Sequence, residues 1–165
     1  MRIGNALAAA ATAVVDLGPL WFKVRRISGA DMLAAGSATL LPVPIVAAIK
    51  AKKKPAKKDL EALAADDTFP GRKVTFEMSV AIAGTVAVSD DKGVTWEPVT
   101  LVTDLADECP LENKLHITTL LPRSELPLSS AILKLGNGGA SAASLATFLA
   151  ANPVVARPTR PSVPR

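Results

Sequence analysis

The sequence predicts an α+β fold, a small mixed domain with a few short strands, including one hairpin, and several helices. Three observations lead to this prediction. Two β-prone stretches flank the turn-forming residues Asp90–Gly93, as in a hairpin. Other stretches place apolar residues at the spacing of one helix face. Apolar residues make up 49% of the 165 residues, which is enough for one core, although much of this content is alanine.

Composition divides the chain into three parts. Residues 1–18 are mostly small and helix-permissive, and we expect an N-terminal helical or flexible segment that ends before Pro19. Residues 19–151 carry the patterned apolar residues and form a single α+β domain with a lysine-rich loop at 50–58. Residues 152–165 are rich in proline and arginine and lack periodicity, which predicts a flexible tail.

The predicted domain begins with a strand and a short helix. Apolar and basic residues partly alternate over Trp21–Ile27, which predicts a half-buried strand whose edge or end lies at Arg26. Ser28 or Asp31 is suited to cap a short helix, which Gly36 would end.

Prolines punctuate the next part of the chain. Because Pro42 and Pro44 favour an extended start, we expect a helix only from about Ile45. Pro55 interrupts the lysine run, which we expect to be a loop or a broken helix. A second helix is predicted over Lys57–Asp67, followed by a turn at Phe69–Gly71. Residues 72–84 fit helical spacing and strict alternation equally well, so periodicity leaves both open.

The hairpin follows. We expect strands over Thr85–Ser89 and Val94–Val102, with Pro98 at an edge or a bulge because proline cannot donate to a sheet. An acidic loop over Thr103–Asn113 and a strand over Leu115–Leu120 come next.

Two helices complete the domain. The first ends at about Leu135, where Gly136–Gly139 stops it, and the second covers Ser141–Ala150 with its apolar residues on one face. The glycine run resembles a phosphate loop only superficially, since no lysine follows it at the required spacing, and we interpret it as a helix end.

The inventory of reactive side chains argues against an enzyme. The chain has one histidine, His116, one cysteine, Cys109, and no tyrosine, so the usual triads and histidine-rich metal sites cannot form within one copy. We therefore expect no catalytic residues, no cofactor and no metal. His116 is interpreted as a partly buried structural residue and Cys109 as an inert thiol.

One cysteine excludes an internal disulfide framework and agrees with a reducing compartment. The N-terminal stretch is too weakly apolar for a signal peptide, and no long apolar window predicts a membrane span. We expect a soluble intracellular protein with no membrane partner.

The formal net charge of +4 comes from two stretches. Residues 50–58 contain six lysines, and residues 157–165 contain three arginines, while acidic residues outnumber basic ones in the remainder. The lysines could neutralise phosphates, but no aromatic residue is interleaved for base stacking, so we favour a solvated loop over nucleic-acid binding. The residues that nucleic acid would contact are Lys52, Lys53, Lys54, Lys57 and Lys58.

The two tryptophans are candidate partner contacts. Trp21 and Trp96 are the largest side chains in a chain with few aromatic residues. Core positions are the commoner role, but an exposed tryptophan would be a strong anchor for a protein partner.

Three segments together resemble one protein family. They are WFKVRRISGADMLAAG (21–36), AIAGTVAVSDDKGVTWEPVTLVTD (81–104) and LHITTLLPRSELPLSSAILKLGNGGASAASLATF (115–148). Each is similar to a part of the tail assembly chaperones of long-tailed bacteriophages, and together they cover about half of the chain.

The resemblance implies a non-catalytic protein of the host cytoplasm. It would bind the tape-measure protein during tail assembly and recruit tail-tube subunits around it, without a cofactor. Two other hypotheses stay open. The prolines and the mixed pattern also fit a structural virion protein, a minor tail or head-completion component, and the lysine run fits a nucleic-acid-binding accessory protein.

Overall fold

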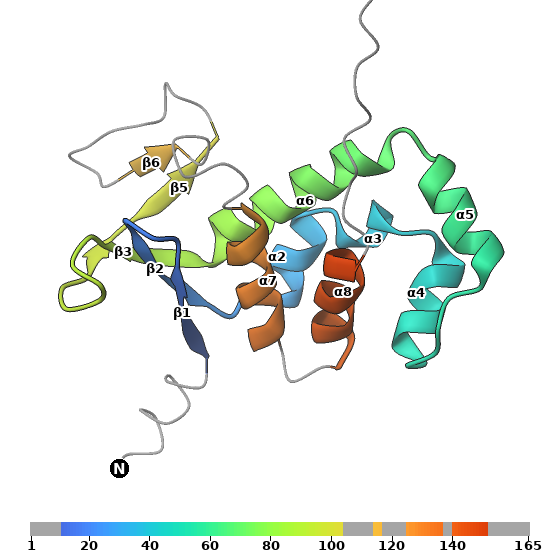
Figure 1. Cartoon of the computed structure of the whole chain (residues 1–165), viewed down its shortest axis with the longest axis horizontal. Coiled ribbons are helices and arrows are strands. Elements are labelled where there is room, and N and C mark those ends of the chain that lie inside the picture. The colour runs from blue at the N-terminus through green and yellow to red at the C-terminus, as the bar shows by residue number, and fades with distance from the viewer. Residues whose placement is uncertain (1–10, 104–113, 117–124, 137–139, 152–165) are drawn as a thin grey trace, which may run out of the picture.

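The computed structural model describes residues 11–103, 114–116, 125–136 and 140–151. This part of the chain forms seven helices, a four-stranded antiparallel sheet and a two-stranded parallel sheet, which confirms the predicted α+β class. The molecule is elongated, with the larger sheet at one end and helices α4 and α5 at the other (Figure 1). Apolar side chains from both sheets and from six of these helices join one continuous core.

The larger sheet has the order β1-β2-β3-β4, with β1 at Thr12–Asp16, β2 at Trp21–Arg25, β3 at Thr85–Ser89 and β4 at Glu97–Pro98. Strands β2 and β3 are therefore the inner strands, and β2 ends at Arg25, just before the predicted end at Arg26. Its alternate side chains separate as predicted. Phe22 and Val24 are buried in the core, whereas Trp21 and Lys23 are half-buried on the opposite, outer face.

The expectation of a helical or flexible segment over residues 1–18 is wrong for β1. Strand β1 pairs with β2 along its whole length, from Thr12 opposite Arg25 to Asp16 opposite Trp21. A tight turn joins the two strands, with the Gly18 N–H donating to Asp16 Oδ1 at 2.8 Å. Pairing with β2 and burial of Val15 outweigh the helix-permissive composition, because local propensity is weaker than tertiary contacts.

Three short helices follow β2, namely α2 at Gly29–Ala34, α3 at Ser37–Leu40 and α4 at Val43–Lys50. The predicted cap is present, since Ser28 and Asp31 form a reciprocal capping box at the start of α2. Gly36 then adopts a φ of 90° after α2. Helix α4 begins two residues earlier than expected, because Pro44 lies in its first turn, where a proline costs no hydrogen bond.

Helix α5 spans Lys57–Ala65 and the long helix α6 spans Phe69–Gly84. The predicted turn at Phe69–Gly71 is therefore wrong, because Pro70 lies in the first turn of α6. The preceding Asp66 carboxylate accepts hydrogen bonds from the Thr68 hydroxyl and the Arg72 guanidinium. These bonds, with the Thr68 bond first, lower the pKa of Asp66 from 3.8 to about 2.

The ambiguous segment over residues 72–84 is helical. Helix α6 buries residues around most of its circumference, which explains why its pattern gave no clear period. Lys73 and Glu77, one turn apart, are each only 1% exposed, and Lys73 Nζ lies 3.3 Å from Glu77 Oε1. Removing either partner of this pair would leave the other as an unpaired charge in the core, which is strongly destabilising.

The predicted hairpin forms, but its second strand is divided. Glu97 and Pro98 pair with β3, the Val99 amide donates to the Val86 carbonyl of β3, and Pro98 lies on the sheet edge as expected. Strand β5 at Thr100–Val102 pairs instead with β6 at Lys114–His116 in parallel. The expected acidic loop lies outside the described residues except for Thr103, and so do residues 117–120 of the expected strand.

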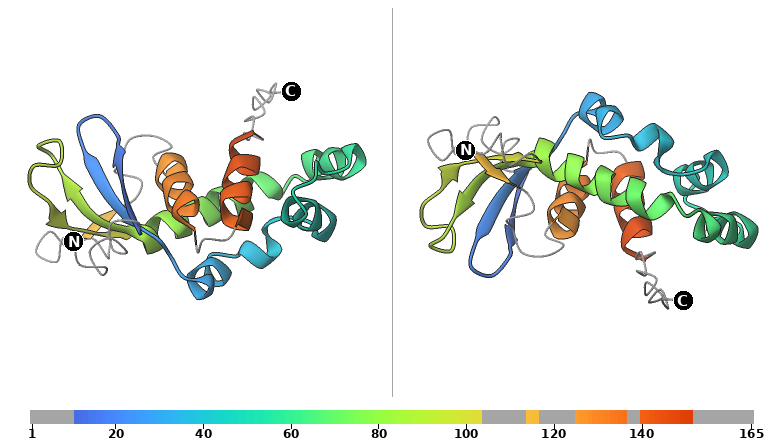
Figure 2. Two further views of the ribbon diagram at one scale, coloured as in Figure 1. Left: turned by 90° about the horizontal axis from the view of Figure 1, so that it is seen from below. Right: turned by 90° about the horizontal axis from the view of Figure 1, so that it is seen from above.

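The last two helices are α7 at Glu125–Leu135 and α8 at Ala140–Ala151. Both agree with their predicted positions. Helices α2 and α3 lie on one side of α6, and α7 and α8 lie on the other (Figure 2). Helix α7 also packs against β1 and β2. Most of the predicted glycine stop and the predicted C-terminal tail lie outside the described residues.

Helices α6 and α7 approach closely at one glycine. A Cβ atom added to Gly84 would lie 2.7 Å from Ile132 Cγ1 and 2.9 Å from Cγ2, and it would also meet Cδ1. Three atoms of a β-branched side chain cannot all move aside by one rotation. The last residue of α6 must therefore be glycine for α7 to reach its position.

We expect Gly84→Ala to lower the free energy of unfolding by about 1–3 kcal/mol, because the added methyl group overpacks the α6–α7 contact. Urea denaturation measures the change. The matched control is Gly71→Ala in the same helix, where an added Cβ meets nothing within 4 Å. This control should raise the free energy of unfolding by about 0.4–1 kcal/mol. Equal effects of the two substitutions would contradict the close contact.

Candidate functional site

The strongest candidate for a binding site is an apolar cavity of about 520 Å³ in the helical part of the molecule. One wall comes from the α2–α4 segment. Met32 and Leu33 belong to α2, Ala38 belongs to α3, and Val46 and Ile49 belong to α4. Leu33 is 64% exposed, so an apolar side chain at the wall remains accessible from solvent.

The opposite wall comes from the C-terminal helices. Ile132 and Leu133 of α7 and Leu145 of α8 line the cavity together with Gly136. Ile132 is the same residue that contacts Gly84, so the α6–α7 packing also positions this wall. The volume falls within the usual range of ligand pockets, and both walls are apolar.

The described lining of the cavity is mainly apolar and carries one charge. Lys50 is the single charged residue among the described residues that line it. Within the described residues, no group of three or more histidine, cysteine, aspartate or glutamate side chains is placed to hold a metal ion. In the same residues, no helix is long and apolar enough to cross a membrane. Because its lining is apolar, the cavity can exclude water from an apolar side chain, with the Lys50 cation beside it.

The two predicted contact tryptophans lie together on the outer face of the larger sheet. A Cβ added to Gly93 would lie 3.1 Å from Trp96 Cζ2 and 3.4 Å from Trp21 Cε3, so both rings border this glycine. Lys23 Nζ lies 4.5 Å from the centroid of the Trp96 ring, a cation–π geometry. We call Trp21, Lys23 and Trp96 the tryptophan cluster.

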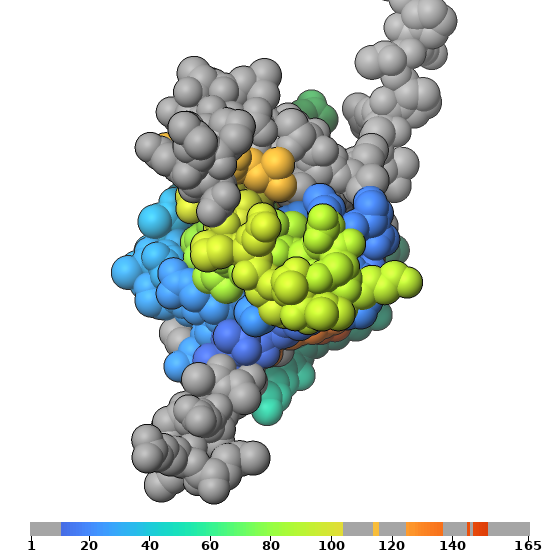
Figure 3. Space-filling model, turned by 90° about the vertical axis from the view of Figure 1, so that its left-hand side faces the viewer, coloured from blue at the N-terminus to red at the C-terminus, as the bar shows by residue number. Residues whose placement is uncertain are grey.

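The turn that positions Trp96 is held by one carboxylate. Asp91 accepts hydrogen bonds from the Ser89 hydroxyl at 2.6 Å and from the Val94 and Thr95 amides at 3.0 and 2.9 Å. Bonds from the Ser89 and Thr95 side chains are the largest causes that lower the pKa of Asp91 from 3.8 to about 2. Gly93 completes the turn with a φ of 84°. When the molecule is viewed from its sheet end, the yellow-green atoms of the β3–β4 region lie at the centre (Figure 3).

The predicted nucleic-acid contacts lie at the opposite end of the molecule. Lys52, Lys53 and Lys54 are exposed in the loop between α4 and α5, whereas Lys57 and Lys58 are exposed in the first turn of α5. Lys57 Nζ lies 3.6 Å from Glu61 Oε1. The structure therefore shortens the expected loop over 50–58, since both of its ends are helical.

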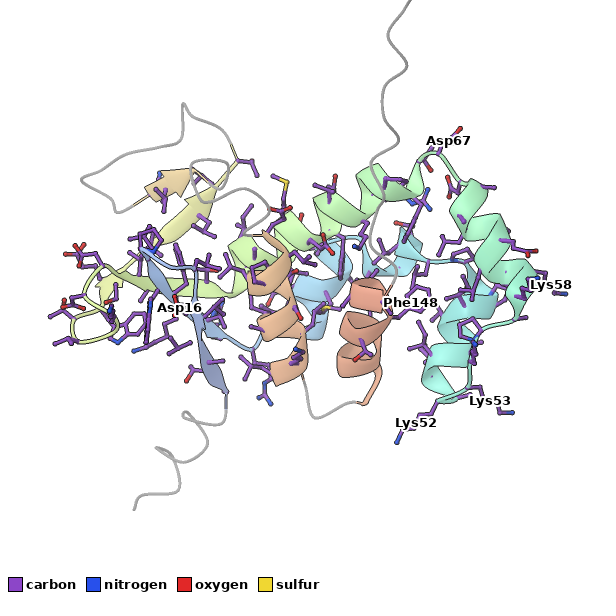
Figure 4. All side chains as sticks on the ribbon, viewed as in Figure 1. Asp16, Lys52, Lys53, Lys58, Asp67 and Phe148 are labelled. Atoms are coloured by element: carbon purple, nitrogen blue, oxygen red, sulfur yellow. The ribbon has the colours of Figure 1, made fainter. Side chains whose placement is uncertain are left out.

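Sequence reasoning missed an aromatic neighbour of these lysines. A groove of about 390 Å³ is lined by Lys52 and Lys53 from the loop and by Phe148 from α8. Figure 4 shows Phe148 on α8 and the two lysines at the end of α4. Phe148 lies nearly a hundred positions after the two lysines in the sequence, so no local pattern could have associated it with them.

Two further residues singled out in the sequence are Cys109 and His116. Cys109 lies outside the described residues. His116 is the last residue of β6, and the prediction about its side chain lies outside what the structure describes.

Comparisons with known proteins identify no relative. No family model, curated protein or solved structure matches the chain.

Acid should loosen the tryptophan cluster through Asp91. Because the pKa of Asp91 is lower in the folded state than its ordinary value of 3.8, its contribution to stability is complete above about pH 4 and is lost as the pH falls toward 2. We expect Asp91→Asn to lower the free energy of unfolding at neutral pH and to reduce its decrease between pH 4 and pH 2. The chain has two tryptophans and no tyrosine, so intrinsic fluorescence reports this cluster directly.

The control for this measurement is Asp90→Asn, which removes the exposed neighbouring carboxylate and none of the hydrogen bonds named above. An Asp90→Asn variant with the same loss of acid dependence as Asp91→Asn would assign the effect to net charge and not to the turn.

Proposed function

We propose that this protein is a non-catalytic chaperone of the phage tail-assembly type, which binds the tape-measure protein and recruits tail-tube subunits around it. The apolar cavity between the α2–α4 segment and helices α7 and α8 is the observation that carries the proposal. The similarity of residues 21–36, 81–104 and 115–148 to this family supports it from the sequence.

The cavity fits the task that such a chaperone performs. A tape-measure protein is long and helical and has apolar faces that need cover before the tail tube surrounds them. An amphipathic helix binds by placing apolar side chains, three or four residues apart, into an apolar groove. Leu33 and Met32 on one wall and Leu145 on the other offer such contacts, and Lys50 offers a cation to an acidic residue beside the apolar stripe.

We expect Leu33→Glu to weaken binding of the tape-measure protein by roughly tenfold or more, because a carboxylate would have to be desolvated against the apolar partner. Co-expression of this chain with the tape-measure protein of the same genome measures the effect as the soluble fraction of that partner. The fold should tolerate the change, since Leu33 is 64% exposed.

The matched control is Val43→Glu, which makes a similar change at an apolar residue that is 81% exposed and lies outside the cavity lining. Wild type and Val43→Glu should both keep the partner soluble. If neither does so, the chaperone function is wrong. If Leu33→Glu keeps the partner as soluble as wild type does, the cavity is not the binding site.

Mass spectrometry of purified particles separates this function from that of a structural virion protein. A chaperone should be absent from the finished particle, whereas a minor tail or head-completion component should be present in it.

A second function, binding of single-stranded nucleic acid, is favoured by the groove that joins Lys52, Lys53 and Phe148. Proteins of this kind combine cations that follow the phosphates with an aromatic ring on which a base stacks. Ile49 and Pro55 extend the apolar floor around Phe148.

This second function predicts that Lys52→Gln with Lys53→Gln reduces the slope of log affinity against log salt by about 1.4 for a single strand, because two phosphate contacts are lost at about 0.7 each. Fluorescence anisotropy with an oligothymidine probe measures the slope. The control pair is Lys134→Gln with Lys92→Gln, which removes two lysines elsewhere on the surface. Equal slopes for the two double variants would leave only non-specific charge attraction.

A further inference from the structure

The two edge strands of the larger sheet differ in how well they could pair with a further strand. Strand β4 is two residues long, contains Pro98 and exposes Glu97, and all of these features discourage pairing with another strand. Strand β1 forms the other edge among the described residues, and its five residues TAVVD include no proline and no lysine. Val14, at its centre, is 50% exposed. Such a strand is a template for addition of a further strand.

We propose that β1 pairs with β1 of a second copy of this chain in an antiparallel register centred on Val14. In this register Val14 lies opposite Val14 of the second copy, Ala13 lies opposite Val15, and Thr12 lies opposite Asp16. Two four-stranded sheets thus become one eight-stranded sheet. This interface lies outside the apolar cavity and does not depend on the proposed chaperone function.

This register places apolar residues of both copies next to each other on the inner face of the joined sheet. Val15 is buried and Ala13 packs against the same core in each copy. Because side chains alternate along a strand, the register brings these two small apolar residues together across the interface. A shift by one residue would place charged Asp16 on the apolar face instead.

Charge complementarity on the outer face favours a second copy as the occupant. Thr12 pairs with exposed Arg25 of β2, and Asp16 pairs with Trp21. In the joined sheet, Thr12 therefore lies between Arg25 of its own copy and Asp16 of the second copy, and the three residues are neighbours on adjacent strands. Neighbouring strands are about 4.8 Å apart, so Arg25 and that Asp16 lie about 10 Å apart at their Cα atoms, within the combined reach of the two side chains.

The present contacts of both charged residues are compatible with this pairing. Asp16 Oδ1 accepts the Gly18 amide at 2.8 Å, and a carboxylate accepts several further hydrogen bonds. Arg25 donates one bond to the Ala83 carbonyl at 3.4 Å, near the limit for such a bond. The joined sheet would also present two copies of the tryptophan cluster on one continuous face.

Sedimentation velocity on the full chain over a concentration series tests the proposal. Wild type should sediment as a dimer of twice the 17.1 kDa chain mass. Val14→Glu and Val14→Lys should each weaken self-association at least tenfold, because like charges then face each other at the centre of the interface. An equimolar mixture of the two variants should regain the dimer, since a carboxylate and an ammonium group then face each other at the same point.

Val94→Glu is the control, because Val94 is 81% exposed and belongs to the β3–β4 turn and not to β1. It should leave the dimer unchanged. Val14→Glu is the safer of the two strand variants for the fold, since Val14 pairs with Lys23, and far-UV circular dichroism verifies it.

Three results would each overturn the proposal. The first is a wild-type chain that stays monomeric up to roughly 0.1 mM, because the dissociation constant would then be too high for ordinary specific association. The second is a dimer that persists in both Val14 variants or is lost in Val94→Glu. The third is a mixture of folded Val14→Glu and Val14→Lys chains that does not associate, because the register requires this rescue.

Discussion

The contact between Gly84 and Ile132 is the constraint on which the other parts of the structure depend. Helix α6 ends at Gly84 and strand β3 starts at Thr85, so the central helix and the sheet are joined without a loop. Helix α7 packs against this junction and against β1 and β2. One helix therefore couples the sheet end of the molecule to the helical end, and only a residue without a side chain permits its approach.

Helix α7 also connects the core with the apolar cavity proposed as the binding site. Ile132 and Leu133 of α7 belong to the core and also line the apolar cavity, so the cavity wall is as fixed as the core behind it. A partner helix would meet a preformed groove, and less conformational entropy is then lost on binding. The larger sheet, which carries the tryptophan cluster, and helices α4 and α5, which flank the lysine groove, lie at opposite ends of the molecule, so occupation of one site leaves the other accessible (Figure 1).

Much of the fold could be predicted from local patterns. The β3–β4 turn, the capping box at Ser28 and the break at Pro55 follow from the chemistry of neighbouring residues, and all are present. The candidate site was predicted less well. Trp21 and Trp96 were identified singly, but their association depends on strand register and on Gly93. The cavity and the position of Phe148 beside Lys52 and Lys53 had no signal, because their residues come from segments distant in the chain.

By itself, the sequence determined the α+β class, the positions of most helices, the separation of basic stretches from an acidic remainder, and the scarcity of histidine, cysteine and tyrosine. These properties depend on composition or on residues a few positions apart. The tertiary structure alone decided that Thr12–Asp16 is a strand, that residues 72–84 are a helix, and that Lys73 and Glu77 are buried. In each case the local preference is weak or balanced, and the free energy of packing against distant residues determines the outcome.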